Sequence, residues 1–275
     1  MRTTTTKAVS LGLLVLGVGC AADPEPMRPE EPTARLDLRL AMKVNDANVI
    51  GLALASDGTR FVFDEYLGLL RIDGNLTTSI VSMVEMPTPD KPIRLPVTDL
   101  VALSPNLFAL TALGDGFLLD TTAMTLTQHF CYVPDGGDGF PTSITQRTDA
   151  IAYDVAADKL YAQPLTFDAG GNLQYAQVAE YNRATGTDEQ WFDAPAGTAA
   201  TGSVFLPGVG LLLGEGAALS RFDFATNTVV PVDDLTRYGV LSIDGLAVDP
   251  ATNTLVVVDK VMDAMIDIDL SRISL

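Results

Sequence analysis

Apolar positions in this chain come in short stretches with strand-like spacing, and patterns of helical period are scarce. The clearest stretch is 244–259, where Leu246 and Val248 alternate with small residues and Thr254 to Val258 is apolar and rich in β-branched side chains. Such residues favour strands, and the composition of the segment from Asp249 to Asn253 is typical of a tight turn. The stretch therefore predicts a strand, a turn and a second, buried strand.

Four fainter copies of this unit precede it, so the chain is a repeat of one strand-rich element. The opening strands of successive copies are 49, 50, 53 and 42 residues apart. A second and a third strand follow in each copy, and a fourth is expected in all but the last, which ends at Leu275. The opening strands are expected at residues 50–54, 99–103, 149–153, 202–206 and 244–248.

One further strand is predicted ahead of the first copy. Residues 35–40, Arg-Leu-Asp-Leu-Arg-Leu, alternate strictly between charged and apolar side chains, which is typical of a half-exposed edge strand. If this strand completes the last copy, every sheet has four antiparallel strands, and that is how a β-propeller closes its ring. We therefore expect an all-β protein, a β-propeller of four-stranded blades over residues 35–275. Five blades are expected, or six if the insert at 166–174 hides further strands.

The segment Asp-Gly-Leu-Ala-Val-Asp-Pro at 244–250 resembles the blade-opening signature of NHL-repeat propellers and of SMP-30, gluconolactonase and strictosidine synthase-like propellers. In SMP-30-like lactonases, a catalytic divalent metal is held at the channel mouth by Glu, Asn and Asp side chains of different blades. Asp244 corresponds to the Asp of that set, Asp149 stands where the family has Asn, and Ile50 replaces the Glu. One fold carries many functions, so the resemblance implies architecture more than activity.

Three of the five opening strands are expected to start with an acid at the mouth of the central channel: Asp99, Asp149 and Asp244. Carboxylates that face one axis repel each other unless they bind a cation, share a proton or turn away to accept backbone N–H groups. Oxygen ligands of this kind suit calcium or magnesium. These aspartates are therefore candidate ligands of a divalent cation, and capping of backbone amides is the competing interpretation.

Other catalytic arrangements lack the residues they need. His129 is the single histidine and is expected on an outer strand, far from the channel, so no Ser-His-Asp triad is supported. His129 and Cys131 alone cannot build a zinc site. The glycine-rich stretch 208–216 flanks a strand rather than a helix, which argues against a phosphate site, and the Asp- and Gly-rich loop 132–140 lacks the EF-hand spacing.

The N-terminus resembles the signal of bacterial lipoproteins. Arg2 and Lys7 are followed by an apolar run at 8–18, which is too short to span a bilayer. Small residues then precede Cys20. The resemblance implies that residues 1–19 are removed and that Cys20 is lipidated. A secretory signal cleaved after a small residue is the alternative.

Residues 20–34 are expected to form a tether. Four prolines and four acids lie among residues 21–34, and such a composition stiffens the chain and prevents packing. At ~3 Å per residue the extended tether would reach about 40 Å. The tether would hold a globular domain away from a membrane surface.

The charge of the chain excludes some partners. The 275 residues carry a net charge of −18, and without residues 1–19 there are 15 basic and 35 acidic residues, a net charge of −20. Such a domain repels nucleic acid and anionic lipid. We therefore expect a lipid-anchored module of the bacterial cell envelope, at the outer membrane or cell surface rather than the inner membrane. It would bind or scaffold a protein or glycan without catalysis; the alternative is a metal-dependent, SMP-30-like lactone or ester hydrolase.

Overall fold

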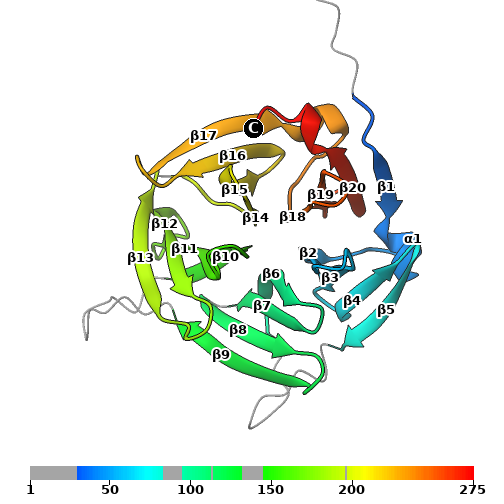
Figure 1. The fold of residues 1–275 in the computed structure, drawn as a ribbon, viewed down its shortest axis with the longest axis horizontal. Coiled ribbons are helices and arrows are strands. Elements are labelled where there is room, and N and C mark those ends of the chain that lie inside the picture. The colour runs from blue at the N-terminus through cyan, green and yellow to red at the C-terminus, as the bar shows by residue number, and fades with distance from the viewer. Residues whose placement is uncertain (1–29, 83–94, 113, 132–144, 196) are drawn as a thin grey trace, which may run out of the picture.

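The computed structural model describes residues 30–82, 95–112, 114–131, 145–195 and 197–275. In this part of the chain, twenty strands form five antiparallel four-stranded sheets around a central axis (Figure 1). The predicted five-bladed β-propeller is confirmed, and the alternative of six blades is wrong. The long third copy is a single blade, because its insert at 166–174 forms the tip of an extended hairpin between the second and third strands.

The strands of each blade follow one another outward from the axis. The first blade contains β2 (Val49–Leu54), β3 (Arg60–Asp64), β4 (Gly68–Asp73) and β5 (Leu76–Val81). The second contains β6 (Val97–Ser104), β7 (Leu107–Ala112), β8 (Asp115–Asp120) and β9 (Thr125–Cys131). The third contains β10 (Thr145–Asp154), β11 (Lys159–Phe167), β12 (Leu173–Asn182) and β13 (Asp188–Ala194). The fourth contains β14 (Gly202–Leu206), β15 (Gly210–Glu215), β16 (Ala218–Asp223) and β17 (Thr228–Asp234).

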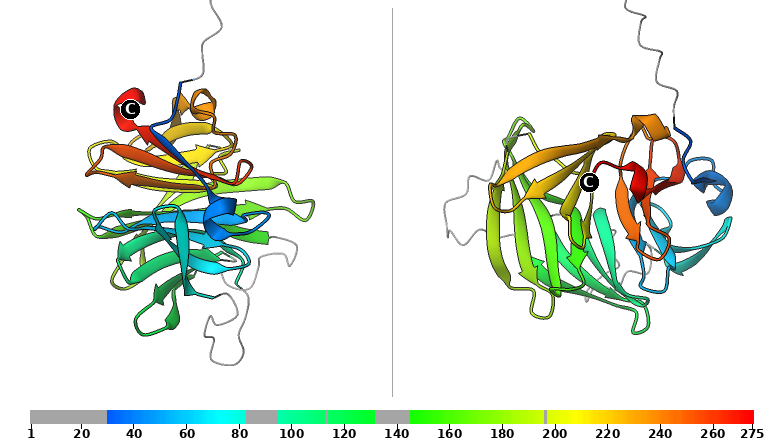
Figure 2. Two further views of the ribbon diagram at one scale, coloured as in Figure 1. Left: turned by 90° about the vertical axis from the view of Figure 1, so that its right-hand side faces the viewer. Right: turned by 45° about the horizontal axis from the view of Figure 1, so that its top comes forward.

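The fifth blade joins the two ends of the described chain. Its three inner strands are β18 (Gly245–Asp249), β19 (Thr254–Asp259) and β20 (Ala264–Asp269), and its outer strand is β1 (Ala34–Asp37). β1 pairs antiparallel with β20, and the side views show it on the outside of the ring (Figure 2). The predicted closure by the N-terminal strand is therefore confirmed.

The closing strand is shorter than its sequence pattern predicts. Residues 35–40 alternate like a strand, but the strand ends at Asp37 and the helix α1 (Leu38–Met42) follows. The Asp37 carboxylate accepts a hydrogen bond from the backbone N–H of Leu40 at 3.2 Å and so caps this helix. Leu38 then points into the seam between the fifth and first blades, where it is fully buried.

Five hydrophobic clusters occupy the seams, one between each pair of neighbouring blades of the described ring. Each inner strand supplies two of them, because successive side chains of a strand point to opposite faces. In β19, Leu255 and Val257 join the cluster shared with the fourth blade, whereas Val256 and Val258 join the cluster shared with the first blade. Burial on both faces explains why this strand is apolar throughout.

Aromatic rings and one ion pair add to these seams. Phe130 of the second blade stacks on Tyr181 of the third with 4.1 Å between ring centroids. At the closing seam, Arg60 of the first blade donates to both carboxylate oxygens of Asp267 in the fifth, each at 2.9 Å. Two parallel hydrogen bonds between one guanidinium and one carboxylate fix the relative orientation of the two groups, and they bind more strongly than a hydrogen bond between neutral groups.

Helical structure in the described residues is confined to α1, η2 (Leu235–Tyr238) and η3 (Leu270–Arg272). No described helix is long and apolar enough to cross a membrane. The predicted signal at 1–19, the lipidation site Cys20 and the loop at 132–140 lie outside the described residues.

Leu38 provides a test of the closing seam. Replacing Leu38 by Ala should lower the free energy of unfolding by about 2–5 kcal/mol, because the leucine is fully buried and its removal leaves a cavity. The matched control is Leu40→Ala in the same helix, where the side chain is 75% exposed and the change should stay within about 0.5 kcal/mol. Urea denaturation of both variants measures the difference, and equal values would contradict the role given to α1.

Candidate functional site

The innermost strands surround the axis (Figure 1), and some of their backbones approach one another closely. A Cβ atom on Gly202 would lie 3.0 Å from the Cα of Gly245, and one on Gly245 would lie 2.7 Å from the backbone nitrogen of Leu52. Only glycine permits such an approach of one backbone to another. Between these strands the axis has no room for further side chains. Gly202, which starts the opening strand of the fourth blade, is therefore required for packing, and a larger side chain that could bind a metal does not fit there.

A cavity of about 270 Å³ opens at the end of the channel where the innermost strands begin, and we call it the mouth cavity. Each of the five blades contributes at least one lining residue. In blade order, these residues are Ile50, Val97, Thr98, Arg147, Asp149, Thr201, Asp244 and Lys260. Two acids and two bases thus meet in one concave site.

Asp149 lies in the wall of the mouth cavity with its side chain only 7% exposed. Its Oδ2 atom forms an ion pair with Arg147, whose guanidinium also lies 5.1 Å from the centre of the Phe167 ring. Its Oδ1 atom is buried and has no hydrogen-bond partner among the described residues. Burial raises the pKa of Asp149, and the charge of Arg147 opposes that shift. Oδ1 is therefore a buried acceptor that no described donor satisfies.

Asp244 and Lys260 line the same cavity from the fifth blade. Asp244 Oδ2 accepts a hydrogen bond from the backbone N–H of Lys260 at 3.0 Å, which is the capping role considered for the predicted aspartates. The side chain of Lys260 is half-buried. Within the described residues, no carboxylate lies within salt-bridge distance of its ammonium group. Lys260, which lines the cavity, therefore carries a positive charge without a bonded counter-charge in the described structure.

Asp99 does not line the mouth cavity. It is 1% exposed, and its carboxylate accepts hydrogen bonds from the backbone N–H of Leu100 at 2.8 Å and from that of Ile151 in the next blade at 3.0 Å. Burial raises the pKa of Asp99 well above its usual value, although these N–H groups act in the opposite direction. Asp99 thus bridges the second and third blades.

The positions expected for the aspartates need correction. β6 begins at Val97 and β10 at Thr145, so Asp99 and Asp149 lie inside their strands rather than at the first position. Asp244 directly precedes β18. Because the strands start at different offsets, the structure brings Asp149 and Asp244 into one cavity and leaves Asp99 deeper in the ring.

Two threonines connect neighbouring blades at the mouth. The Thr98 hydroxyl donates to the Thr148 carbonyl of the next blade, and the Thr201 hydroxyl donates to the carbonyl of Ile243, directly before the fifth blade. These hydroxyl groups are already engaged in holding the ring together. Among the charged residues that line the cavity, Asp149 Oδ1 and the Lys260 ammonium have no bonded partner in the described structure.

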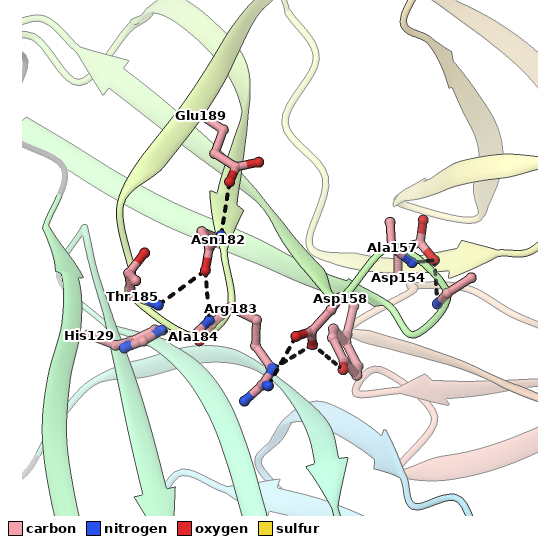
Figure 3. A network of polar contacts seen from close by, with 11 residues as sticks. His129, Asp154, Ala157, Asp158, Asn182, Arg183, Ala184, Thr185 and Glu189 are labelled. Atoms are coloured by element: carbon pink, nitrogen blue, oxygen red, sulfur yellow. Dashed lines mark hydrogen bonds and ion pairs between the residues drawn. The ribbon is translucent and has the colours of Figure 1, made fainter.

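His129 lies on β9, the outermost strand of its blade, as predicted (Figure 3). Its Nε2 atom is 2.7 Å from the carbonyl oxygen of Arg183, in the turn between β12 and β13 of the next blade. Gly186 closes that turn with φ 71°, and a Cβ atom there would lie 1.9 Å from the His129 carbonyl oxygen. Arg183 in turn pairs with Asp158 at 3.0 Å. His129 therefore joins two blades at the rim.

A larger cavity, of about 560 Å³, lies between β1 and the first blade. Two of its arginines have partners: Arg60 binds Asp267, and Arg71 binds Asp73 at 2.9 Å. Arg35 also lines it and forms no ion pair with a described residue. The smaller mouth cavity is the better candidate, because all five blades contribute to it and it brings acids and bases together at the end of the channel.

The mouth cavity suits a divalent cation poorly. Asp149 is already paired with Arg147, and Lys260 adds a second positive charge that would repel a metal ion. In the described part of the chain, no three His, Cys, Asp or Glu side chains are grouped so that they could hold a metal. Calcium bound by Asp99, Asp149 and Asp244 stays a prediction.

Sequence reasoning missed the two bases of the site. Arg147 lies two residues before Asp149 in β10, and the two side chains form an ion pair where the pairing of β10 with β11 becomes irregular after Thr148. Lys260 directly follows β19, at the same end of the blade as the start of β18. The short spacing between Arg147 and Asp149 was the signal that the sequence offered. It was missed because the opening strand of the third blade was expected to start at residue 149, whereas β10 starts at Thr145.

These features define the class of the protein as a five-bladed β-propeller with an ionic cavity at the mouth of its channel. No protein-family model and no curated protein matches the sequence. A solved gluconolactonase from Xanthomonas campestris, described as important in glucose secondary metabolic pathways, has a similar fold. The TM-score is 0.52 and the identity 12%, with 80% of this chain and 72% of that chain covered.

Two further solved structures match with lower scores. One is the extracellular domain of a putative one-component system of B. thetaiotaomicron, with a TM-score of 0.37 and 13% identity over 79% of this chain and 31% of that chain. The other belongs to a mitotic checkpoint complex, with a TM-score of 0.44 and 11% identity. The match covers 90% of this chain and 98% of that chain. At these identities the likeness concerns the fold alone.

Asp99→Ala tests the bridge at the axis. The variant leaves two buried N–H groups without an acceptor, and we expect a loss of about 3 kcal/mol in the free energy of unfolding at acid pH. Burial raises the folded-state pKa, so the folded protein holds this proton more tightly than the unfolded chain. The stabilisation by Asp99 is therefore complete below the unfolded pKa of about 4 and declines as pH rises through the folded value. The difference between wild type and variant should shrink from acid to neutral pH.

Urea denaturation across this pH range measures that difference. Asp57→Ala is the control, because the backbone N–H of Thr59 lowers the pKa of this exposed carboxyl. Its small stabilisation should instead be lost as pH falls. A cost of Asp99→Ala that grows with pH would contradict the assignment.

Proposed function

We propose that this protein is a binding module of the bacterial cell envelope, anchored by a lipid at Cys20, and that its channel mouth binds a partner glycan or protein. One observation carries the proposal: residues from all five blades converge on the mouth cavity, where Asp149 Oδ1 and the Lys260 ammonium have no bonded partner among the described residues. The blades hold these groups in fixed positions, so little conformational entropy is lost when a ligand binds.

The course of the chain near its described beginning supports a tethered arrangement. Glu30 lies 3.6 Å from Arg237, and the Glu31 carbonyl accepts a hydrogen bond from Arg272 at 2.9 Å. The chain thus meets the ring at its rim, beside the fourth and fifth blades (Figure 1). A tether attached there leaves the mouth cavity free for a partner.

The second candidate is a metal-dependent hydrolase of lactones or esters. The fold likeness to a gluconolactonase and the presence of two carboxylates in one cavity favour it. The burial of Asp149 favours it too, because a raised pKa suits a carboxyl group for proton transfer. The two bases disfavour it, since Arg147 already pairs with Asp149 and Lys260 adds a second positive charge to the lining of the cavity.

Cys20→Ser tests the anchor. The variant should move from the membrane fraction to the soluble fraction and should no longer incorporate labelled fatty acid, because serine cannot form the thioether to the lipid. Cys131→Ser, which changes the other cysteine of the chain, should stay in the membrane fraction. Retention of Cys20→Ser in the membrane fraction would contradict lipid anchoring.

Asp244→Ala tests the mouth. We expect wild-type protein to bind members of an envelope glycan array, and the variant to bind them at least about tenfold more weakly, a difference near 1.4 kcal/mol. Asp57→Ala, in the turn at the other end of the first blade, should bind like wild type. Calcium-dependent hydrolysis of D-glucono-1,5-lactone that is lost in Asp244→Ala would instead favour the hydrolase.

A further inference from the structure

We infer that the turn between β19 and β20 couples the N-terminal segment of the described chain to the mouth cavity, so that the cavity keeps its shape only while this segment is docked. The segment is residues 33–47, which comprise β1, α1 and most of the loop before β2, and we call it the strap. The turn is residues 260–263, which we call the mouth turn. The inference goes beyond the proposed binding function and holds whatever ligand the mouth binds.

The strap is fixed to the mouth turn through Asp263, which is 8% exposed. The backbone N–H of Leu38 donates to the Asp263 carbonyl oxygen at 2.8 Å, and that of Ala47 donates to Asp263 Oδ1 at 3.2 Å. Arg39 adds a charge contact, with 3.6 Å between its Nε atom and Asp263 Oδ2. Groups in α1 and in the loop after it therefore hold one residue of the mouth turn.

The same turn positions two residues of the mouth cavity. The Asp263 N–H donates to the Lys260 carbonyl oxygen at 3.4 Å and so closes the turn. The Lys260 N–H donates to Asp244 Oδ2 at 3.0 Å, and both residues line the cavity. Asp259, at the end of β19, is fully buried and accepts the N–H of Leu241 at 2.6 Å. The turn therefore also holds the segment that leads into β18.

The strap can leave the ring while the rest of the fifth blade stays paired. β1 pairs with β20 over four residues, whereas β18, β19 and β20 pair with one another without it. Terminal segments open at a lower free energy than core strands. Two states follow. In the docked state Leu38 is buried in the closing seam, and in the released state Asp263 has lost its contacts with the strap. Such a two-state element is what coupling between distant groups requires.

Release of the strap loosens the mouth turn and with it the positions of Lys260 and Asp244. By reciprocity, a ligand that binds these residues in their docked positions favours the docked strap. β1 is the first strand of the described chain, so in a protein anchored at Cys20 a pull on the anchor acts on the strap before it acts on the other blades. Tension would then weaken binding at the mouth, and this trigger alone rests on the proposed lipid anchor.

Hydrogen exchange of the full chain in detergent, measured by mass spectrometry, tests the coupling. Leu38→Ala weakens the strap at the closing seam and leaves the side chains of the mouth turn intact. Amides of residues 241–244 and 259–263 should exchange at least about tenfold faster than in wild type, a difference of about 1.4 kcal/mol. This increase should exceed the increase in β7.

Leu110→Ala is the matched control, since Leu110 is also fully buried but lies in β7, in the seam between the first and second blades. In this variant the order should be reversed, with the larger increase in β7. Fast exchange of the strap in Leu38→Ala beside a mouth turn as protected as in wild type would overturn the inference. A strap that exchanges no sooner than β7 in this variant would overturn it too, because the strap would not be separable from the ring.

Asp244→Ala tests the coupling from the mouth. It removes the acceptor of the Lys260 N–H, and amides of residues 34–42 should exchange faster than in wild type. Asp120→Ala, which removes the acceptor of the Thr122 N–H in a turn of the second blade, should leave them unchanged. Melting temperatures establish that the variants are folded, and Asp244→Ala decides the outcome if Leu38→Ala does not fold. An unchanged strap in Asp244→Ala would contradict the coupling without affecting the proposed function, since no ligand or anchor enters the measurement.

Discussion

The structure depends on one constraint: each blade has two apolar faces, and a sheet can bury both only between two neighbours. Five seams, each filled by a hydrophobic cluster, satisfy this condition for every blade in the described ring. A linear stack of the same sheets would leave two apolar faces in water, and at roughly 25 cal/mol per Å² such exposure is expensive. Closure is therefore required, and the pairing of β1 with β20, together with Leu38 in the closing seam, provides it.

Closing the ring with only five blades brings the innermost strands into close contact. Gly202 and Gly245 allow their backbones to approach, and the carboxylate of Asp99 accepts N–H groups of two blades where the strands meet. Space for a ligand opens where the strands diverge at their first residues. The site is therefore a geometric consequence of blade number: the same convergence that fills the axis places residues of all five blades around one small cavity at its end.

The electrostatics of this cavity differ from those of the whole molecule. The chain is strongly acidic, with a net charge of −18, yet the mouth contains Arg147 and Lys260 beside two carboxylates. Arg147 is held by Asp149, whereas Lys260 retains its bonding capacity. A locally positive group within an acidic molecule disfavours a metal ion, and the acidic surface around it repels large polyanions. This contrast connects the fold to the proposed binding function.

Repeat spacing and strand periodicity determined the all-β class, the five blades and the closure by an N-terminal strand, because these features follow from local patterns and from the burial that each pattern requires. The sequence also indicated Asp149 and Asp244 as residues of the channel mouth. It could not show that the closing strand stops at Asp37, because the alternation continues through Leu40 and only the seam between two blades draws Leu38 inward. Nor could the sequence show that Asp99 lies outside the mouth cavity or that Lys260 lines it beside Asp149 and Asp244. These placements depend on the offset of each strand along the axis, which is set by the packing of neighbouring blades. Tertiary structure alone decided which charges meet, because residues of five blades, far apart in the chain, reach one cavity only after the ring has closed.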